Sequence, residues 1–252
     1  MNACVFTGPT ISPTEARRHL DALYLPPAAE GDVYRAALKE PRAIGIIDGY
    51  FHFTPAVRHK EILWAMSRGI HVFGSASMGA LRAAELLAFG MEGVGAIFEM
   101  YRDNILEDDD EVALVHAPAE MDFRAGSEAM VNIRQTLEKA KRLGVISPDA
   151  QMKLEQLAKN TFYPERTCSL LLSQARRSGL SDKDATALEQ WLPAGQVNQK
   201  REDAIAMLQL MRNRLAAGLE PKKVIYHFER TAMWEAARQR SGDSQSAATT
   251  EG

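Results

Sequence analysis

The feature that constrains the fold most is a strand, a helix and a second strand in succession over residues 42–77. Apolar residues dominate 42–51 ("RAIGIIDGYF") and 69–77 ("GIHVFGSAS"), as is typical of buried strands. Between them, a Thr-Pro pair at the start and Gly69 after the end predict a helix over 55–68. A crossover of this length makes the two strands parallel and adjacent.

Two more apolar segments extend this pattern, one over residues 3–8 and one over 112–117. The sequence therefore predicts an α/β fold in which residues 1–126 form a short parallel, Rossmann-like sheet layer. From 127 to 239 the strand pattern disappears, and apolar residues recur three or four apart between Gly, Pro and Ser joints. We expect a helical region there, packed on the first domain. The polar tail 240–252 is expected to be disordered.

Charge and hydropathy exclude several classes of protein. The net charge is −3; residues 1–126 carry 11 Lys and Arg against 18 Asp and Glu, and residues 127–252 carry 19 against 15. This small basic excess is too weak for nucleic-acid binding, although it would suit an acidic protein partner. No run of eighteen apolar residues occurs, and the first residues lack the pattern of a signal peptide. A cytoplasmic protein with no membrane partner is expected.

The sequence contains no motif that predicts a metal or cofactor site. Cys4 and Cys168 belong to no CxxC pair, so we expect two buried thiols and neither a disulfide nor a zinc site. The acidic run 107–111 ("EDDDE") lacks the spacing of a calcium loop and is interpreted as a solvated loop, with partner docking as the alternative. Neither GxGxxG nor a P-loop pattern is present, so no nucleotide is expected.

The carboxyl ends of parallel strands meet at one edge of a sheet, where open α/β proteins bind their ligands. In this sequence those ends carry small, polar and aromatic residues suited to a binding site. They are Gly8, Pro9, Asp48, Gly49, Tyr50, Ser75, Ser77 and Gly79.

Within this edge, the segment "SASMG" places Ser77 between small residues at a strand-to-helix turn. Such a turn exposes a nucleophilic serine in many hydrolases, and the N–H groups at the start of the following helix, at Met78 and Gly79, would stabilise an anion. Serine is also a favoured N-cap residue. The pattern leaves both roles open.

A serine nucleophile needs a base, and Lys60 is the first candidate. On the predicted helix it lies three residues from Leu63 and four from Trp64, along an apolar stripe. Burial disfavours the ammonium form, which would suit a general base, whereas a snorkelling side chain would keep its amine in water. His59 is the other candidate, about 100° further round the helix.

Several segments, taken together, resemble the core of the TfuA-like family, in the same order and spacing over about residues 3–118. The helical half resembles the family more loosely. The segments that carry the resemblance are "VFTGPT", "LPPAAEGDVYRA", "IGIIDGYFHFTPAVRHKEIL", "VFGSASMGALRAAEL", "FGMEGVGAIFEMYRD" and "DDDEVALVHA".

The resemblance implies a function in making peptide thioamides. Members of the family accompany YcaO enzymes, which activate a backbone amide with ATP. The TfuA-like partner is understood to hydrolyse a thiocarboxylated ubiquitin-like sulfur carrier such as ThiS and so to release sulfide. The family's Ser–Lys pair corresponds here to Ser77 and Lys60.

Other residues at the same edge take supporting roles in this interpretation. Arg82, with Met78 and Gly79, would hold the developing negative charge. Asp48 would orient either Lys60 or the loop, with a structural role at the strand end as the alternative. Ser75 is a weaker nucleophile candidate because relatives often carry alanine there. Gly49, Tyr50 and His59 complete the predicted surroundings of the site.

Two rival functions remain beside the hydrolase. The first is a non-catalytic adaptor that docks the YcaO protein with its peptide substrate or with the sulfur carrier. The second is a nucleotide-binding regulator, which ATP would stabilise against heat. Sulfide release by the purified protein separates the hydrolase from the adaptor.

Overall fold

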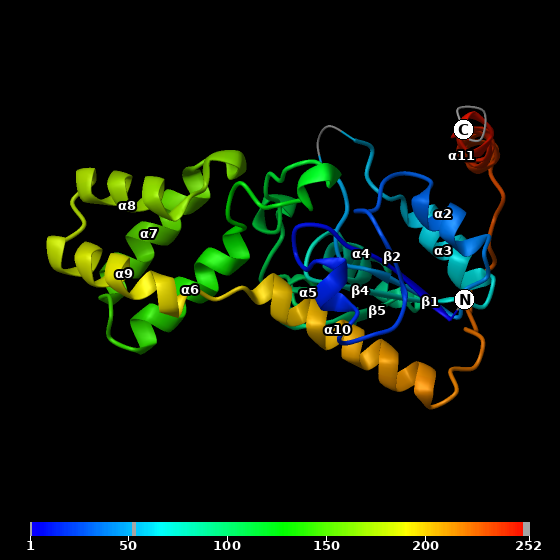
Figure 1. Ribbon diagram of the computed structural model, residues 1–252, viewed down its shortest axis with the longest axis horizontal. Coiled ribbons are helices and arrows are strands. Elements are labelled where there is room, and N and C mark those ends of the chain that lie inside the picture. The colour runs from blue at the N-terminus through cyan, green and yellow to red at the C-terminus, as the bar shows by residue number, and fades with distance from the viewer. Residues whose placement is uncertain (1, 52–53, 249–252) are drawn as a thin grey trace. The chain divides into compact units, whose positions relative to one another are not determined.

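The structure is a computed structural model that describes residues 2–51 and 54–248, with the side chains of 241–248 left aside. The chain forms two compact units, shown in Figure 1. The first, which we call the sheet unit, comprises Met1–Ile105 and Asp203–Gly252. The second, the helical unit, comprises Leu106–Glu202. These boundaries fall at 105 and 202 instead of at the predicted residue 126.

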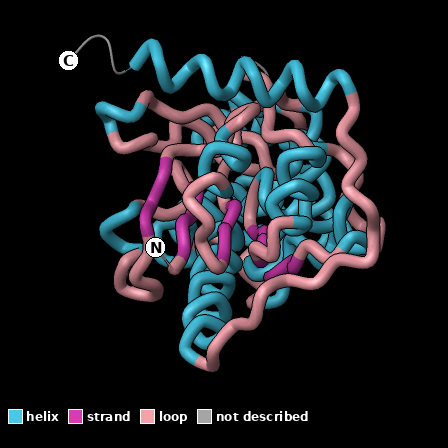
Figure 2. Tube along the Cα trace, turned by 90° about the vertical axis from the view of Figure 1, so that its right-hand side faces the viewer, coloured by secondary structure: helices cyan, strands magenta, loops and turns pink. Residues whose placement is uncertain are grey.

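The sheet unit is built on five parallel strands in the order β2-β1-β3-β4-β5. Figure 2 shows the strands side by side with helices around them. The predicted α/β fold with a short parallel sheet is therefore confirmed. The strands are β1 (Ala3–Phe6), β2 (Leu23–Leu25), β3 (Ala43–Ile46), β4 (His71–Ser75) and β5 (Glu92–Val94).

One predicted strand and the predicted start of one helix are wrong. Residues 112–117 form no strand, because the Val112 carbonyl accepts a hydrogen bond from the Lys200 ammonium at 2.8 Å and the Val115 N–H donates to the Ser127 hydroxyl at 2.9 Å. The helix predicted over 55–68 begins only at His59. Its expected first turn is pulled into an extended path, since the Pro55 carbonyl accepts the Glu30 N–H at 2.8 Å.

Helices cover both faces of the sheet. Side chains alternate along β3, so Gly45 lies on the face opposite to that of Ile44 and Ile46. α10 packs on the Gly45 face, where the absence of a side chain leaves room for Met207 and Met211. α2 contacts β3, α3 contacts β4, and α4 contacts both strands. The helices of this unit are α1 (Pro13–Ala16), α2 (Asp32–Ala37), α3 (His59–Ser67), α4 (Met78–Leu86), α5 (Ala96–Arg102), α10 (Gln199–Ala216) and α11 (Ala232–Ala248).

A carboxylate ties α10 into the sheet unit. Asp203, near the start of α10, accepts the N–H groups of Ala96 and Ile97 at 3.1 and 2.8 Å and so caps α5. The preceding Gly95 has a φ of 100°, a conformation that favours glycine. This contact explains why part of the predicted helical half belongs to the sheet unit.

The helical unit confirms the helices predicted from the spacing of its apolar residues. Serine and threonine cap three of them, at Ser147, Thr167 and Ser181. Buried leucine, alanine and isoleucine side chains form the core. The helices are α6 (Met130–Arg142), α7 (Pro148–Asn160), α8 (Cys168–Arg177) and α9 (Asp182–Gly195).

The tail predicted to be disordered over 240–252 is helical as far as Ala248, as part of α11. The helix is anchored near its start by Trp234, which is buried. Alanine and glutamine, which favour helix, follow in the sequence. Residues 249–252 lie outside the described residues.

Candidate functional site

The loops at the carboxyl ends of β1 and β3 are held together by Asp48. Its carboxylate accepts the N–H groups of Gly8 and Thr10 at 2.8 and 3.1 Å and the Thr10 hydroxyl at 2.6 Å. Both oxygens are thus engaged by the loop after β1. Asp48 thus has a structural role at the strand end, where it orients the loop after β1.

The turn that carries Ser77 is strained. Ala76 has a φ of 65°, and the Ser77 N–H donates to the Ser75 carbonyl at 2.7 Å. A three-residue turn of this kind with positive φ at its centre is rare, and alanine pays a steric cost there that glycine avoids. Strain of this kind is often found at functional sites. The turn sets Ser77 at the first position before α4.

Glycines let α4 start in direct contact with the sheet. A Cβ at Gly79 would overlap the Ile46 carbonyl oxygen, and one at Gly74 would overlap the Gly79 carbonyl. At Gly49 a Cβ would lie 2.7 Å from Met78 Cγ. The segments around β3 and β4 and the start of α4 are therefore in contact at the strand ends.

The Ser77 hydroxyl does not cap the helix. Its backbone carbonyl accepts the N–H groups of Ala80 and Leu81, whereas its side chain makes no capping hydrogen bond. Ser77 is 2% exposed. Within residues 2–51 and 54–248, no partner is found for its hydroxyl. The hydroxyl is thus not engaged as a helix cap, the alternative role that the sequence pattern left open.

One N–H at the start of α4 is available to an anion. The Gly79 N–H, predicted to hold negative charge, donates to the Ile47 carbonyl at 3.3 Å. The Met78 N–H has no acceptor among the described residues. Because it lies next to Ser77 at the positive end of the helix dipole, it is the donor best placed for an oxyanion on a group attached to Ser77.

Arg82 is engaged by other protein groups. Its Nε donates to the Val57 carbonyl at 2.9 Å, and its Nη1 pairs with Glu85 at 2.7 Å. His59 Nε2 lies 2.7 Å from the same Glu85 oxygen. Burial raises the pKa of Glu85, but the hydrogen bonds from His59 and Arg82 outweigh it, and the net pKa is lowered. The predicted charge-holding Arg82 instead ties α4 to the segment before α3.

Lys60 lies at a different contact from the predicted one. Its Nζ is 4.6 Å from the ring centroid of Phe228, and no hydrogen bond joins it to Ser77 among the described residues. It lines a cavity of about 320 Å³ between α2, α3 and the C-terminal segment. The walls of this cavity also include Glu30, Tyr34, Arg58, Glu61, Thr231, Trp234 and Arg238.

The remaining residues predicted for the site are buried or turned elsewhere. Ser75 is fully buried, and its hydroxyl has no hydrogen-bond partner in the described part of the chain. Tyr50 lines a second cavity, of about 410 Å³, with Arg35 of α2 and with Lys39, which follows that helix. Burial and the nearby charge of Asp32 raise the pKa of Tyr50.

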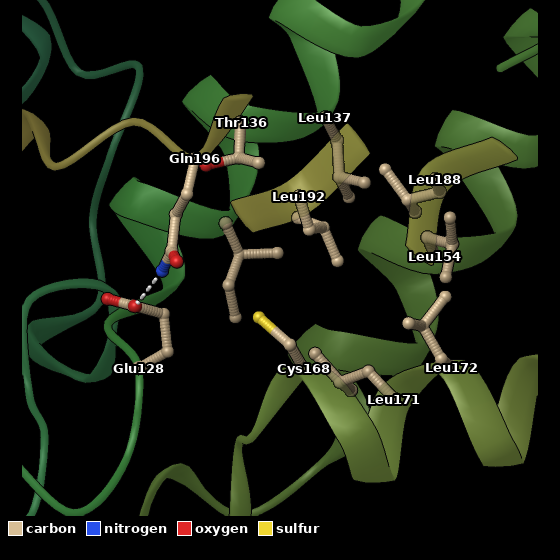
Figure 3. Close-up of a pocket in the computed structure, with 11 residues that line it drawn as sticks. Glu128, Thr136, Leu137, Leu154, Cys168, Leu171, Leu172, Leu188, Leu192 and Gln196 are labelled. Atoms are coloured by element: carbon tan, nitrogen blue, oxygen red, sulfur yellow. Dashed lines mark hydrogen bonds between the residues drawn. The ribbon is translucent and has the colours of Figure 1, made fainter. Parts of the chain in front are cut away.

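A third cavity, of about 40 Å³, lies inside the helical unit and is shown in Figure 3. Leucines line most of it, and at one side Gln196 donates to Glu128 at 2.6 Å. Burial raises the pKa of Cys168, which faces this cavity, and raises that of Cys4 to about 12. Neither thiol is a ready nucleophile.

The acidic run 107–111 is only in part the solvated loop that we expected, since Glu107, Asp108 and Asp109 are exposed but Asp110 and Glu111 are not. Lys159 pairs with Asp108, Asp110 and Glu111, and Arg134 pairs with Glu111. The fully buried Arg166 also holds Asp110. These ion pairs give the run a structural role inside the helical unit. No group of three or more metal-ligating side chains is found in the described part of the chain.

Taken together, the fold and this edge define a parallel-sheet α/β protein with an unpartnered serine hydroxyl at the start of a helix. A family model described as TfuA-like protein matches residues 48–167, which include both Lys60 and Ser77. This match supports a TfuA-like classification. No curated protein matches the sequence. None of the described helices is long and apolar enough to span a bilayer.

Proposed function

We propose that the protein is a Ser–Lys hydrolase of peptide backbone thioamidation. It would hydrolyse the C-terminal thiocarboxylate of a ubiquitin-like, ThiS-like sulfur carrier and deliver sulfide to a YcaO enzyme in the cytoplasm. The observation that carries this proposal is the free Ser77 hydroxyl, held by a strained turn beside the unpartnered Met78 N–H.

In the first step of the proposed reaction, the Ser77 oxygen attacks the thiocarboxylate carbon while the Lys60 amine accepts the hydroxyl proton. The Met78 N–H and the dipole of α4 stabilise the oxygen that becomes negative. The C–S bond then breaks, and the proton held by Lys60 leaves with the sulfur as hydrosulfide. The carrier remains joined to Ser77 as an ester.

Water completes the cycle. Lys60 removes a proton from the attacking water, the ester bond breaks, and the Ser77 oxygen takes the proton back. The products are free enzyme and the carrier's carboxylic acid, which loses its proton to solvent and becomes the carboxylate. Because Lys60 rests on Phe228 in the structure, both steps require its amine to move to Ser77.

Substitution of Lys60 tests its role as a base, by following sulfide from a thiocarboxylated carrier. Lys60→Ala and Lys60→Arg should each lower the rate by about 10²- to 10⁴-fold, since arginine stays charged and accepts no proton. Lys39→Ala, in the same unit, should leave the rate unchanged. A Lys60→Arg variant as active as the wild type would mean that Lys60 serves only as a cation on Phe228.

The position of Lys60 also favours a second function, that of a non-catalytic adaptor between the YcaO protein and its peptide or sulfur carrier. In that case the amine belongs to the packing of the C-terminal segment and has no proton to accept. Purified protein would then release no sulfide from the thiocarboxylated carrier, with or without Lys60, while still binding one of the two proteins.

A further inference from the structure

The C-terminal strap, residues 221–240, runs along α3 after the end of α10 (Figure 1). Two hydrogen bonds fix its path. The Lys222 N–H donates to the Gly69 carbonyl at 2.8 Å, and the Tyr226 hydroxyl donates to the Leu63 carbonyl at 2.7 Å. The strap therefore lies against the helix that carries Lys60.

Aromatic rings hold the strap in place. Trp234 is 4% exposed and packs on Tyr34 of α2 and Trp64 of α3, with ring centroids 5.5 and 5.9 Å away. Phe228 meets the Trp234 ring edge to face at 5.3 Å. Aromatic pairs at these distances add to the stabilisation from burial. The strap is thus attached chiefly by a small cluster of rings around Trp234.

The same cluster holds Lys60. Its Nζ lies over the Phe228 ring, and no carboxylate pairs with it in the part of the chain that the structure describes. A cation–π contact stabilises the ammonium form over the neutral amine. While Phe228 is in place, its ring holds the Lys60 amine by this contact, and no hydrogen bond joins the amine to Ser77 among the described residues.

The cavity beside Lys60 provides space into which the amine can move. Its volume of about 320 Å³ is bounded on one side by Thr231 and Trp234 of the strap and on the other by Tyr34 and Glu61. Movement of the strap would release the amine without disturbing the buried face of α3, where Ile62 and Met66 pack on the sheet unit.

We infer that the C-terminal strap restrains the Lys60 amine, and that Phe228 is the residue through which it does so. Its consequence for catalysis rests on the proposed function: the strap is an autoinhibitory contact that must open before Lys60 serves Ser77. The restraint itself concerns only the reactivity of one amine, and is measured without any substrate.

Chemical labelling of Lys60 tests the restraint. The full chain is acetylated with a limiting amount of N-hydroxysuccinimidyl acetate, and labelling of Lys60 relative to Lys39 is measured by peptide mass spectrometry. Phe228→Leu keeps an apolar side chain but removes the ring face, and should raise Lys60 labelling by about two- to thirtyfold, the ratio equivalent to about 0.5–2 kcal/mol for a cation–π contact.

Two matched variants control the comparison. Phe228→Tyr keeps the ring and should label as the wild type does, as should Ile225→Ala, at a strap residue that is 97% exposed. Circular dichroism shows whether each variant is folded. Equal Lys60 labelling in Phe228→Leu and wild type, with both folded, would overturn the inference.

Sulfide release by the same variants separates the inference from the proposed function. A parallel rise in labelling and sulfide release in Phe228→Leu supports both. A rise in labelling with no sulfide from any variant supports the restraint and contradicts the hydrolase. A rise in labelling with slower sulfide release than wild type would show that the contact is productive, and would overturn autoinhibition.

Discussion

Replacing Ser77 with alanine should lower sulfide release from a thiocarboxylated carrier by on the order of 10³-fold or more, because the nucleophile itself is lost. Folding should be unaffected, since the hydroxyl makes no capping hydrogen bond and no partner of it lies in the described residues. Initial rates of sulfide formation and the thermal midpoint of the variant measure the two effects.

Ser75 provides the matched control for this prediction. It lies two residues earlier, is fully buried and leaves its hydroxyl without a hydrogen bond. Removing an unsatisfied buried hydroxyl is neutral or stabilising, so Ser75→Ala should keep the wild-type rate. If Ser75→Ala loses activity and Ser77→Ala keeps it, the assignment of the nucleophile is wrong.

Replacing Gly79 with alanine should have the largest effect on stability. The added Cβ would overlap the carbonyl oxygen of Ile46, which belongs to the central strand β3 and has no room to retreat. Because α4 would have to move off the sheet, we expect a loss of about 3 kcal/mol or more in the free energy of unfolding. Urea denaturation followed by circular dichroism measures it.

A second glycine gives the comparison for Gly79. At Gly126 the nearest atom to an added Cβ is a Val115 methyl carbon at 3.3 Å, which has freedom to shift, and the backbone needs no positive φ. Gly126→Ala should therefore change the free energy of unfolding by less than about 1 kcal/mol. An equally small loss in Gly79→Ala would mean that α4 does not press on β3 as described.

The strands that the sequence predicted are those with long apolar runs. β1, β3 and β4 each lie within such a run, whereas β2 and β5 have three residues each and show no period that distinguishes them from loops. The false strand at 112–117 has the same apolar character, but its backbone groups are taken by Lys200 and Ser127. A pattern of apolar residues within one segment does not indicate which distant side chains will form hydrogen bonds with its backbone.

Helical periodicity predicted α10 correctly but not where it packs. Met207 and Met211 lie on one apolar face, and that face meets Gly45 of β3, more than 150 residues earlier in the chain. The same limit applies to the strap, because nothing in the spacing of Phe228 and Trp234 indicates that they surround Lys60.

At the candidate site, the sequence predicted the position of Ser77 but not the contacts that Arg82 and Lys60 make. The turn, the strand end and the start of α4 follow from local residues and are present. The partners of Arg82 and the place of the Lys60 amine depend on Val57, Glu85 and Phe228, which meet them only in the folded chain. Residues 52–53, in the loop before α3, lie outside the described residues.

The most direct test of Ser77 as a nucleophile is to trap the ester. Wild-type protein and thiocarboxylated carrier are mixed, quenched in acid within the first turnover, and digested with trypsin. Cleavage after Arg68 and Arg82 yields one peptide containing both Ser75 and Ser77, and fragmentation assigns the modified serine. We predict the carrier's C-terminal residues in ester linkage to Ser77. An ester on any other residue, or sulfide release without an ester, would contradict the account.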